Sequence, residues 1–310
     1  MTTPKVSIVI PLFNKEEYIL VALNSVLKQS FKNWECLVID DGSTDNSCKV
    51  VEKYINEHPG NWSLITQENE GPSSTRNRGI ASSRGEYIAF LDADDFWHPN
   101  KLERQIEIMD LDTSIAMTLS RYLIFSEEKG LTMKVVTFQS IKKLLSGWLK
   151  MTGFGGLVES TGMIRSSLIT PLLFFDTSLP TSEGLDYVLK WSQVGKISFI
   201  PKIGTFYRIS TNQLHRNEDS VIASMRVLAN RNSTGKQLAR LTSLHSSYFE
   251  LSSLRNISLT SKIYKIMHKF LKGDRTFIYI FVSVLVRNIF ARILAIGKKA
   301  YFRNAIKAIS

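Results

Sequence analysis

Short apolar segments alternate with helix-patterned segments through the first hundred residues, and this alternation constrains the fold more than any other feature. Strands are predicted where β-branched and aromatic residues cluster, at 5–10, 34–39, 62–66 and 86–91, the first of them stopping at Pro11. Helices are predicted between them, at 18–27, after Asp45 and at 73–82. The pattern is typical of an α/β fold with a parallel, doubly wound sheet.

Two of the predicted strands end in acidic residues. Asp40 and Asp41 follow the second strand, and Asp92, Asp94 and Asp95 follow the fourth. Ligands of such sheets bind at the carboxyl ends of the strands, so this topology brings both acid clusters to one edge. Side chains two positions apart in extended backbone point the same way, so Asp92 and Asp94 are expected to act together.

Paired carboxylates of this kind suit Mg²⁺ or Mn²⁺, and these cations neutralise a diphosphate. Each acid taken singly has an ordinary alternative as a turn or cap residue. The chain has no G-x-G-x-x-G motif after the first strand and no Walker P-loop. A diphosphate would therefore be held by the metal and by a base such as Arg76 or Arg78. The two cysteines, Cys36 and Cys48, do not make a disulfide framework or a zinc site.

Four motifs resemble those of the family 2 glycosyltransferases in order and spacing. They are Val6 to Asn14, Val38 to Asp45, Asn69 to Gly79 with its Arg-Asn-Arg-Gly element, and Gly85 to Asp95. The resemblance implies the glycosyltransferase-A fold, a nucleotide-diphosphate sugar donor, a divalent metal, and inversion at the anomeric carbon.

The resemblance also implies roles for individual residues. Pro11 opens the loop beneath the nucleotide, and Asp41 is similar to the acid that accepts a hydrogen bond from the base, usually uracil. Arg76 matches the nucleotide-side arginine. Asp92 resembles the contact to the ribose or donor sugar, and Asp94 the residue that meets the metal, with both carboxylates assigned to the metal site.

The region around residue 184 departs from the family pattern. The resemblance places the family's catalytic aspartate at Gly184, which has no carboxylate. Glu183 and Asp186 flank that position, and either side chain can serve as the base after a small loop shift. We favour Asp186 slightly, because aspartate is the family's usual choice, although Asp186 also suits a helix cap.

The resemblance continues more weakly toward residue 215. A strand is predicted at 196–201, and Arg208 follows in a stretch that resembles the family's closing element, where it can approach the diphosphate. His215 is a second, weaker candidate in the same stretch. The tryptophans are candidates for stacking on a sugar or for core packing: Trp97, Trp148 and Trp191.

The C-terminal fifty residues are strongly basic. Residues 261–310 contain eleven Lys and Arg against one acid, so they hold +10 of the formal net charge of +11. Residues 262–272 are patterned as a basic amphipathic helix, and a second predicted helix follows with a mostly apolar ten-residue stretch at 277–286. This tail lacks the recognition signatures of nucleic-acid-binding modules, so a nucleic-acid partner is not predicted.

Helices of this kind can lie in an anionic membrane surface, but no segment reaches the roughly 18 apolar residues that a spanning helix needs. The start of the chain lacks the features of a signal peptide. We therefore expect a cytoplasmic protein, peripheral on the inner face of the cell membrane. In the alternative, the tail packs on the catalytic domain or on a second subunit of a homo-oligomer.

These observations predict a two-part enzyme, with a catalytic domain at 1–215 and a helical, basic region at 216–310. Its predicted reaction is inverting transfer of a sugar from a nucleotide-sugar donor, usually a UDP-sugar, to a carbohydrate or lipid-linked acceptor. Two alternatives stay open: a non-catalytic, transferase-like membrane scaffold, which Gly184 favours, and a sugar-phosphate nucleotidyltransferase, although residues 11–17 lack the glycine-rich basic loop such an enzyme needs.

Overall fold

The alternation of strands and helices is confirmed in a computed structural model that describes residues 3–125, 134–136, 159–179 and 183–209. Each predicted element of the first hundred residues is present, with ends that shift by only a few residues. These elements are β1 (Val6–Leu12), α1 (Ile19–Leu27), β2 (Trp34–Asp40), α2 (Ser47–Glu57), β3 (Trp62–Thr66), α3 (Pro72–Ser82) and β4 (Tyr87–Phe90).

The later elements follow a less regular order. They are β5 (Phe96–Trp97), α4 (Lys101–Leu111), β6 (Ile115–Phe125), β7 (Lys134–Val136), the short helix η1 (Glu159–Thr161), β8 (Gly162–Arg165), η2 (Ser166–Leu168), η3 (Pro171–Leu173), α6 (Glu183–Val194) and β9 (Lys196–Arg208). The strand predicted at 196–201 is thus confirmed and is longer than predicted.

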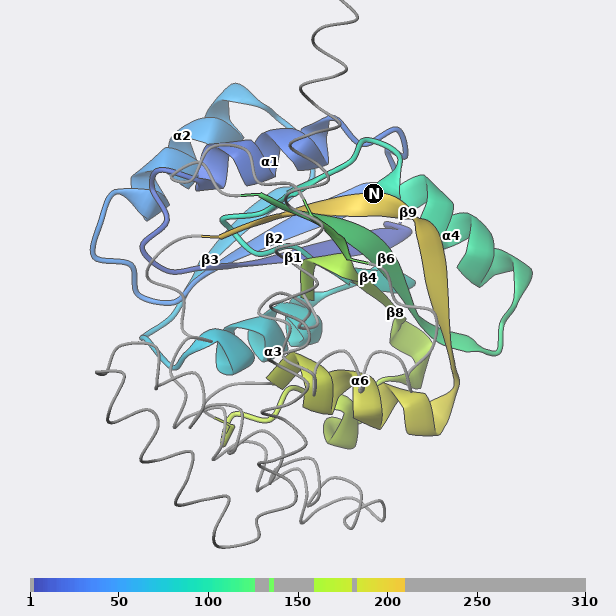
Figure 1. Ribbon diagram of the computed structural model, residues 1–310. Helices are drawn as coiled ribbons and strands as arrows, with labels where there is room; N and C mark the ends of the chain where they lie inside the picture. The colour runs from blue at the N-terminus through green and yellow to red at the C-terminus, as the bar shows by residue number, and fades with distance from the viewer. Residues whose placement is uncertain (1–2, 126–133, 137–158, 180–182, 210–310) are drawn as a thin grey trace, which may run out of the picture. The chain divides into compact units, whose positions relative to one another are not determined.

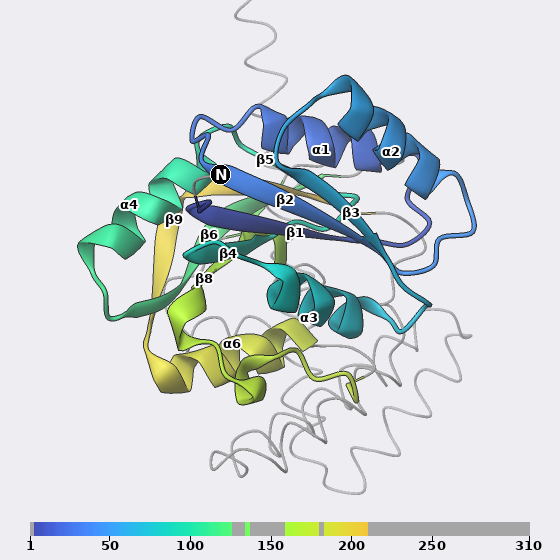
Figure 2. The same ribbon diagram turned by 180° about the vertical axis from the view of Figure 1, so that it is seen from behind.

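One mixed sheet contains all of the described strands, in the order β3-β2-β1-β4-β8-β6-β9-β5, with β7 paired to β6. The first four strands are parallel, as predicted, but β8 runs antiparallel to both β4 and β6. The hydrophobic pattern of a strand does not encode its direction, so the sequence did not indicate this reversal. Helices α1 and α2 cover one face of the sheet and α3 and α6 the other, as Figure 1 and the reverse view in Figure 2 show.

The prediction that β1 ends before Pro11 is wrong by two residues, because the strand continues through Pro11 to Leu12. Pairing with β4 ends at Val9, whereas pairing with β2 continues to Leu12. Proline lacks only the backbone N–H, and among the described strands none lies opposite Pro11 on the β4 side to accept that hydrogen bond. The strand therefore carries the chain to the sheet edge where β2 also ends.

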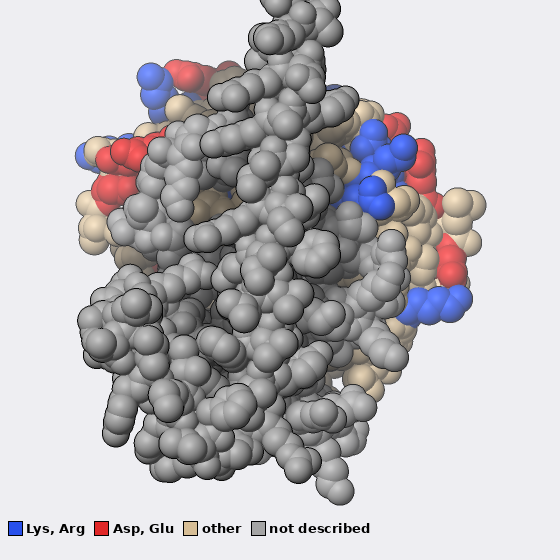
Figure 3. All heavy atoms as spheres, in the orientation of Figure 1, with Lys and Arg blue, Asp and Glu red and all other residues tan. Residues whose placement is uncertain are grey.

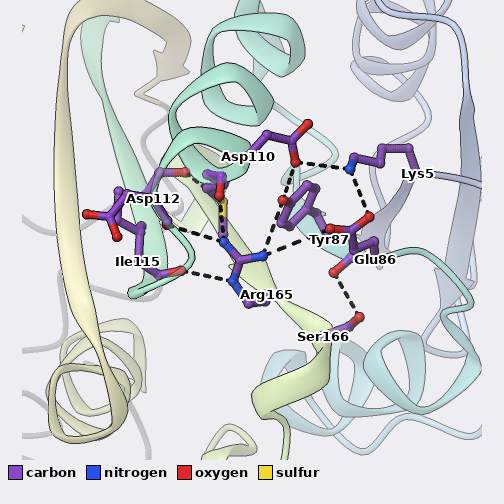
Figure 4. A network of polar contacts seen from close by, with 10 residues as sticks. Lys5, Glu86, Tyr87, Asp110, Asp112, Ile115, Arg165 and Ser166 are labelled. Atoms are coloured by element: carbon purple, nitrogen blue, oxygen red, sulfur yellow. Dashed lines mark hydrogen bonds and ion pairs between the residues drawn. The ribbon is translucent and has the colours of Figure 1, made fainter.

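A polar network joins the elements at the end of the sheet where the parallel strands β1 and β4 begin (Figure 4). The Arg165 guanidinium donates to the Tyr87 hydroxyl at 3.3 Å, and that hydroxyl donates to Asp110 at 2.5 Å. Lys5 forms ion pairs with Glu86 at 2.8 Å and with Asp110 at 3.0 Å. Buried polar groups need such partners, so this network joins β1, β4, β8 and α4 as structural support, away from the carboxyl ends of the parallel strands.

The predicted helical region at 216–310, and with it the boundary at residue 215, lies outside the described residues. Among the helices that the structure does describe, none has the length and hydropathy required to cross a membrane. On the described surface visible in Figure 3, acidic and basic side chains lie next to one another. That part of the surface therefore shows no large region of one charge.

Gly79 sets how closely α3 approaches the sheet. A Cβ at this position would overlap both methyl groups of Val9, which is fully buried in β1. We expect Gly79→Ala to lower the free energy of unfolding by about 1–3 kcal/mol, because overpacking outweighs the gain in helix propensity. Urea denaturation checks this. Gly60→Ala is the matched control, since its Cβ would meet only Trp62 at 3.4 Å; equal stability of the two variants would contradict the prediction.

Candidate active site

The carboxyl ends of β1, β2 and β4 lie side by side, so the loops that follow them meet at one edge. The register pairs Leu12 with Asp40, and the Asp41 amide donates to the Leu12 carbonyl at 2.8 Å. Pro11, at this end of β1, is partly buried. The predicted convergence of the two acid clusters at one sheet edge is therefore present.

Asp41 is buried and holds the loop that leads into α3. Its carboxylate accepts from the Gln67 side-chain amide at 2.8 Å, the Glu70 backbone amide at 3.0 Å and the Gly71 backbone amide at 2.9 Å. A carboxylate has about four acceptor positions, so roughly one remains for a ligand. Asp41 therefore shapes this loop and retains the capacity to accept a hydrogen bond from a base.

Arg76 lies at the centre of an acidic cluster. Its Nη2 lies 2.6 Å from Asp92 Oδ1, and its Nη1 lies 3.5 Å from Glu183 Oε1. Its guanidinium also lies over the Phe175 ring, 5.5 Å from the centroid. Burial alone lowers the pKa of Arg76, but the carboxylates of Asp92, Glu159 and Glu183 outweigh burial and hold that pKa above its usual value. Arg76 is thus a permanent cation facing three acids.

Asp94 contacts two other cations, one through its side chain and one through its backbone. Its Oδ2 lies 2.7 Å from Lys15 Nζ, and its backbone carbonyl accepts from Arg208 Nε at 3.0 Å. The structure therefore brings Arg208 to Asp94, and its expected approach to a diphosphate stays a prediction. It also divides the Asp-x-Asp element, since Asp92 faces Arg76 and Asp94 faces Lys15.

Asp95 fastens the loop that carries both acids. Its buried carboxylate accepts from the Ser160 hydroxyl at 2.6 Å and from the Arg208 backbone amide at 3.0 Å. The Ser160 oxygen in turn accepts from the Asp92 backbone amide at 2.9 Å. Burial raises the pKa of Asp95 well above its usual value, and the negative charges of Asp94 and Asp92 raise it further.

Glu159 is a member of the cluster that the sequence analysis missed. Burial raises its pKa to about 8; Arg76 opposes this shift, whereas Glu183 and Asp92 add to it. No periodic pattern surrounds Glu159 in the sequence. It reaches the cluster because β8, which follows it, pairs with β4. Only this long-range strand pairing indicates that Glu159 belongs to the cluster.

The two candidate bases lie in different environments, although both begin α6. Glu183 contacts Arg76 in the acidic cluster, and its side chain is 19% exposed. Asp186 is buried and forms an ion pair with Lys190, one helical turn later, at 2.6 Å. Gly184 between them is buried. The contacts therefore join Glu183, and not Asp186, to Arg76 and Asp92.

The remaining candidate residues lie in the core, on the surface or outside the described residues. Trp97 is buried and donates from its indole nitrogen to the Ser160 carbonyl at 2.8 Å, and Trp191, on α6, is fully buried. Both tryptophans are core residues in this structure. Arg78 is exposed on α3. Trp148 and His215 lie outside the described residues.

The donor set for a divalent metal is partial. Among the residues that the structure describes, no group of three or more His, Cys, Asp or Glu side chains is arranged to hold a metal ion. Asp94 offers a carboxylate oxygen of the right chemistry, with its second oxygen engaged by Lys15. Mg²⁺ usually binds through one or two carboxylates together with substrate phosphates, so these residues fit a metal shared with a diphosphate.

The sequence of this chain is similar to those of known proteins. The sequence profile described as "Glycosyl transferase family 2" matches residues 7–166. The chain is 34% identical over 219 residues to the Escherichia coli "UDP-Glc:alpha-D-GlcNAc-diphosphoundecaprenol beta-1,3-glucosyltransferase WfgD", covering 69% of this chain and 80% of that protein. It spans about half the length of several other curated relatives, 54%, 46% and 49% in three cases.

Solved structures agree on the fold. Residues 1–349 of S. aureus TarS, in complex with UDP-GlcNAc, align with a TM-score of 0.60 at 22% identity, covering 89% of this chain and 79% of that one. The Pyrobaculum calidifontis mannosyltransferase PcManGT, in complex with GDP-Man and Mn²⁺, aligns with a TM-score of 0.56 at 14% identity, covering 93% and 88%. The predicted glycosyltransferase-A fold is therefore confirmed.

Glu159 predicts a pH dependence of stability. Its pKa of about 8 in the folded protein exceeds the ordinary value of 4.5, so the folded state keeps this proton where the unfolded state releases it. Its contribution to the free energy of unfolding is complete below pH 4.5 and is lost as the pH rises through about 8. Urea denaturation across this range should show Glu159→Gln becoming more stable relative to the wild type as pH increases.

Glu57→Gln is the control for this measurement, because Glu57 is 56% exposed at the end of α2. Its stability difference from the wild type should stay nearly constant across the range. A Glu159→Gln curve parallel to that of the wild type would contradict the raised pKa.

Proposed function

The chain belongs to the glycosyl transferase family 2, and from this membership we propose that it transfers a sugar from a UDP-sugar to a hydroxyl group of a lipid-linked oligosaccharide or cell-surface polysaccharide, with inversion at the anomeric carbon. The observation that carries the proposal is the carboxyl edge of the sheet, where Asp92 and Asp94 each meet a cation. The printed activity of WfgD and the UDP-sugar bound by TarS support the choice of donor and acceptor classes.

The nucleotide would lie along the loops after β1 and β2. In this proposal Pro11 borders the nucleotide, and the Asp41 carboxylate accepts a hydrogen bond from the uracil imide. Arg76 holds Asp92 toward the ribose or donor sugar through the 2.6 Å ion pair. Arg208 lies beside Asp94 and donates to the diphosphate.

Asp94 is the proposed protein ligand of Mg²⁺ or Mn²⁺, with Asp92 beside it. Such a metal, when bound, neutralises the charge that develops on the departing nucleoside diphosphate. Arg76 and Arg208 add fixed positive charge on either side of the Asp-x-Asp element. The PcManGT complex with Mn²⁺ supports this choice of cofactor.

The transfer step needs a base that removes the proton of the acceptor hydroxyl while its oxygen attacks the anomeric carbon. The oxygen forms the new glycosidic bond, the bond to the diphosphate breaks, and the diphosphate carries away the bonding electrons. Glu183 and Asp186 are the candidate bases. The contacts favour Glu183, because it shares Arg76 with Asp92 whereas Asp186 pairs with Lys190.

The basic tail supports a location at the membrane. Residues 261–310 carry +10, and each Lys or Arg near an anionic leaflet contributes about 1 kcal/mol to binding. In this proposal the tail docks on the inner face of the cell membrane from the cytoplasm, where a lipid-linked acceptor is accessible. Gly184 favours one other candidate, a membrane scaffold that binds nucleotide without turnover. Measured turnover of a nucleotide sugar separates the two.

Metal dependence is the first test of this proposal. We expect a chelator to abolish turnover of UDP-sugars and to weaken UDP binding, because Asp94 and the diphosphate would share the ion. Asp94→Asn should lose turnover in the presence of Mn²⁺. The matched control is Asp112→Asn, since Asp112 lies 43% exposed in an ion pair with Lys196. Unchanged turnover in the presence of the chelator would contradict the proposed metal dependence.

The base is tested with two nearly isosteric variants. We expect Glu183→Gln to lower donor turnover by about 10²–10⁴-fold, the usual contribution of general-base catalysis, with little change in UDP affinity. Asp186→Asn should retain turnover, because Asp186 is engaged with Lys190. The opposite result, loss in Asp186→Asn with Glu183→Gln active, would assign the base to Asp186.

A further inference from the structure

Lys15 forms an ion pair with Asp94, the carboxylate that the proposed metal would use. Its Nζ lies 2.7 Å from Asp94 Oδ2, and the pair joins the loop after β1 to the loop after β4. The Lys15 side chain is 30% exposed and that of Asp94 is 15% exposed. A ligand can therefore reach the pair, which gives Lys15 a place in the site that its sequence context did not indicate.

The backbone that carries Lys15 is held firmly. The Lys15 amide donates to the Ser47 hydroxyl at 2.8 Å, at the start of α2. The preceding residue, Asn14, has a left-handed backbone with φ of 49°, and its side-chain oxygen accepts from the Thr44 amide at 2.8 Å. These bonds fix the loops after β1 and β2 to each other. The Lys15 ammonium thus extends on a flexible four-carbon stem from a fixed base.

A second cation approaches the same acid. Arg208 Nε donates to the Asp94 carbonyl at 3.0 Å, and its guanidinium lies 4.7 Å from the centroid of the Tyr18 ring. Lys15 Nζ lies 5.9 Å from that centroid. The neighbouring acids have other partners, since Asp92 pairs with Arg76 and Asp95 accepts from Ser160. Lys15 therefore pairs with the Asp94 carboxylate and Arg208 with the Asp94 backbone carbonyl, so two positive charges meet one negative charge at this residue, an arrangement that favours the arrival of a further anion.

We propose that Lys15 is a diphosphate-binding residue that exchanges partners: it pairs with Asp94 in the donor-free protein and with the diphosphate of the bound nucleotide once a divalent metal takes the Asp94 carboxylate. This role rests on the proposed nucleotide-sugar donor. A divalent ion at Asp94 repels the ammonium, whereas the diphosphate that shares the ion attracts it. The stem of Lys15 allows the exchange without movement of the backbone.

This exchange predicts opposite effects on two ligands. Lys15→Met removes the competitor for Asp94, so Mn²⁺ alone should bind more tightly. The same variant loses one charge-assisted contact to the diphosphate, so UDP in saturating Mn²⁺ should bind about tenfold more weakly. A purely structural role of Lys15 would instead weaken both ligands together.

The experiment uses the full chain. Electron paramagnetic resonance of free Mn²⁺ reports metal binding without nucleotide, and isothermal titration calorimetry reports UDP binding in Mn²⁺. Lys15→Arg should keep UDP affinity within about threefold, because it keeps the charge. Lys53→Met is the matched control, since Lys53 is 77% exposed on α2. Thermal unfolding verifies that each variant is folded.

The outcomes separate this role from the proposed function. If the wild type binds UDP and Lys15→Met binds it equally well, Lys15 does not contact the diphosphate and the inference is overturned. Weaker binding of both Mn²⁺ and UDP by Lys15→Met would also overturn it, in favour of a structural role. If the wild type itself does not bind UDP in Mn²⁺, the proposed donor fails and the role of Lys15 fails with it.

Discussion

The buried carboxylate of Asp95 is the interaction on which the geometry of the site depends. It accepts hydrogen bonds from Ser160 and from the Arg208 backbone, residues 65 and 113 positions later in the chain. Burying a carboxylate is costly, and these hydrogen bonds offset that cost only when all three segments are in place. The loop after β4 therefore takes its conformation from the completed fold, and with it the positions of Asp92 and Asp94.

The division of the Asp-x-Asp element follows from this support. Ser160 accepts from the Asp92 amide, and Arg208 donates to the Asp94 carbonyl, so the backbone of each acid is held by a different residue. Their side chains consequently reach different cations, Arg76 on α3 and Lys15 after β1. In the proposed function, Asp92 then contacts the ribose or donor sugar, and Asp94 lies on the side of the diphosphate.

The sequence predicted the parts of the site that local pattern encodes. The strand-helix alternation predicted β1 to β4 and the shared edge of their acids. The motifs there indicated Asp41, Arg76 and Asp94 as site residues, and the roles of these three residues stay predictions. It did not predict Glu159 or the role of Ser160, because both depend on β8 pairing antiparallel to β4, which no local pattern specifies. Trp97 and Trp191 were ambiguous for a related reason, since a tryptophan in the core and one in a cleft look alike in sequence.

The absence of a carboxylate at residue 184 is consistent with the electrostatics of its surroundings. Arg76 already faces Asp92, Glu159 and Glu183, and burial with too few cations raises the pKa of Glu159 to about 8. Another carboxylate beside Glu183 would add a negative charge to a cluster that keeps one acid largely protonated near neutral pH. With glycine at 184, fewer carboxylates compete for Arg76, whose Nη1 lies 3.5 Å from Glu183 Oε1.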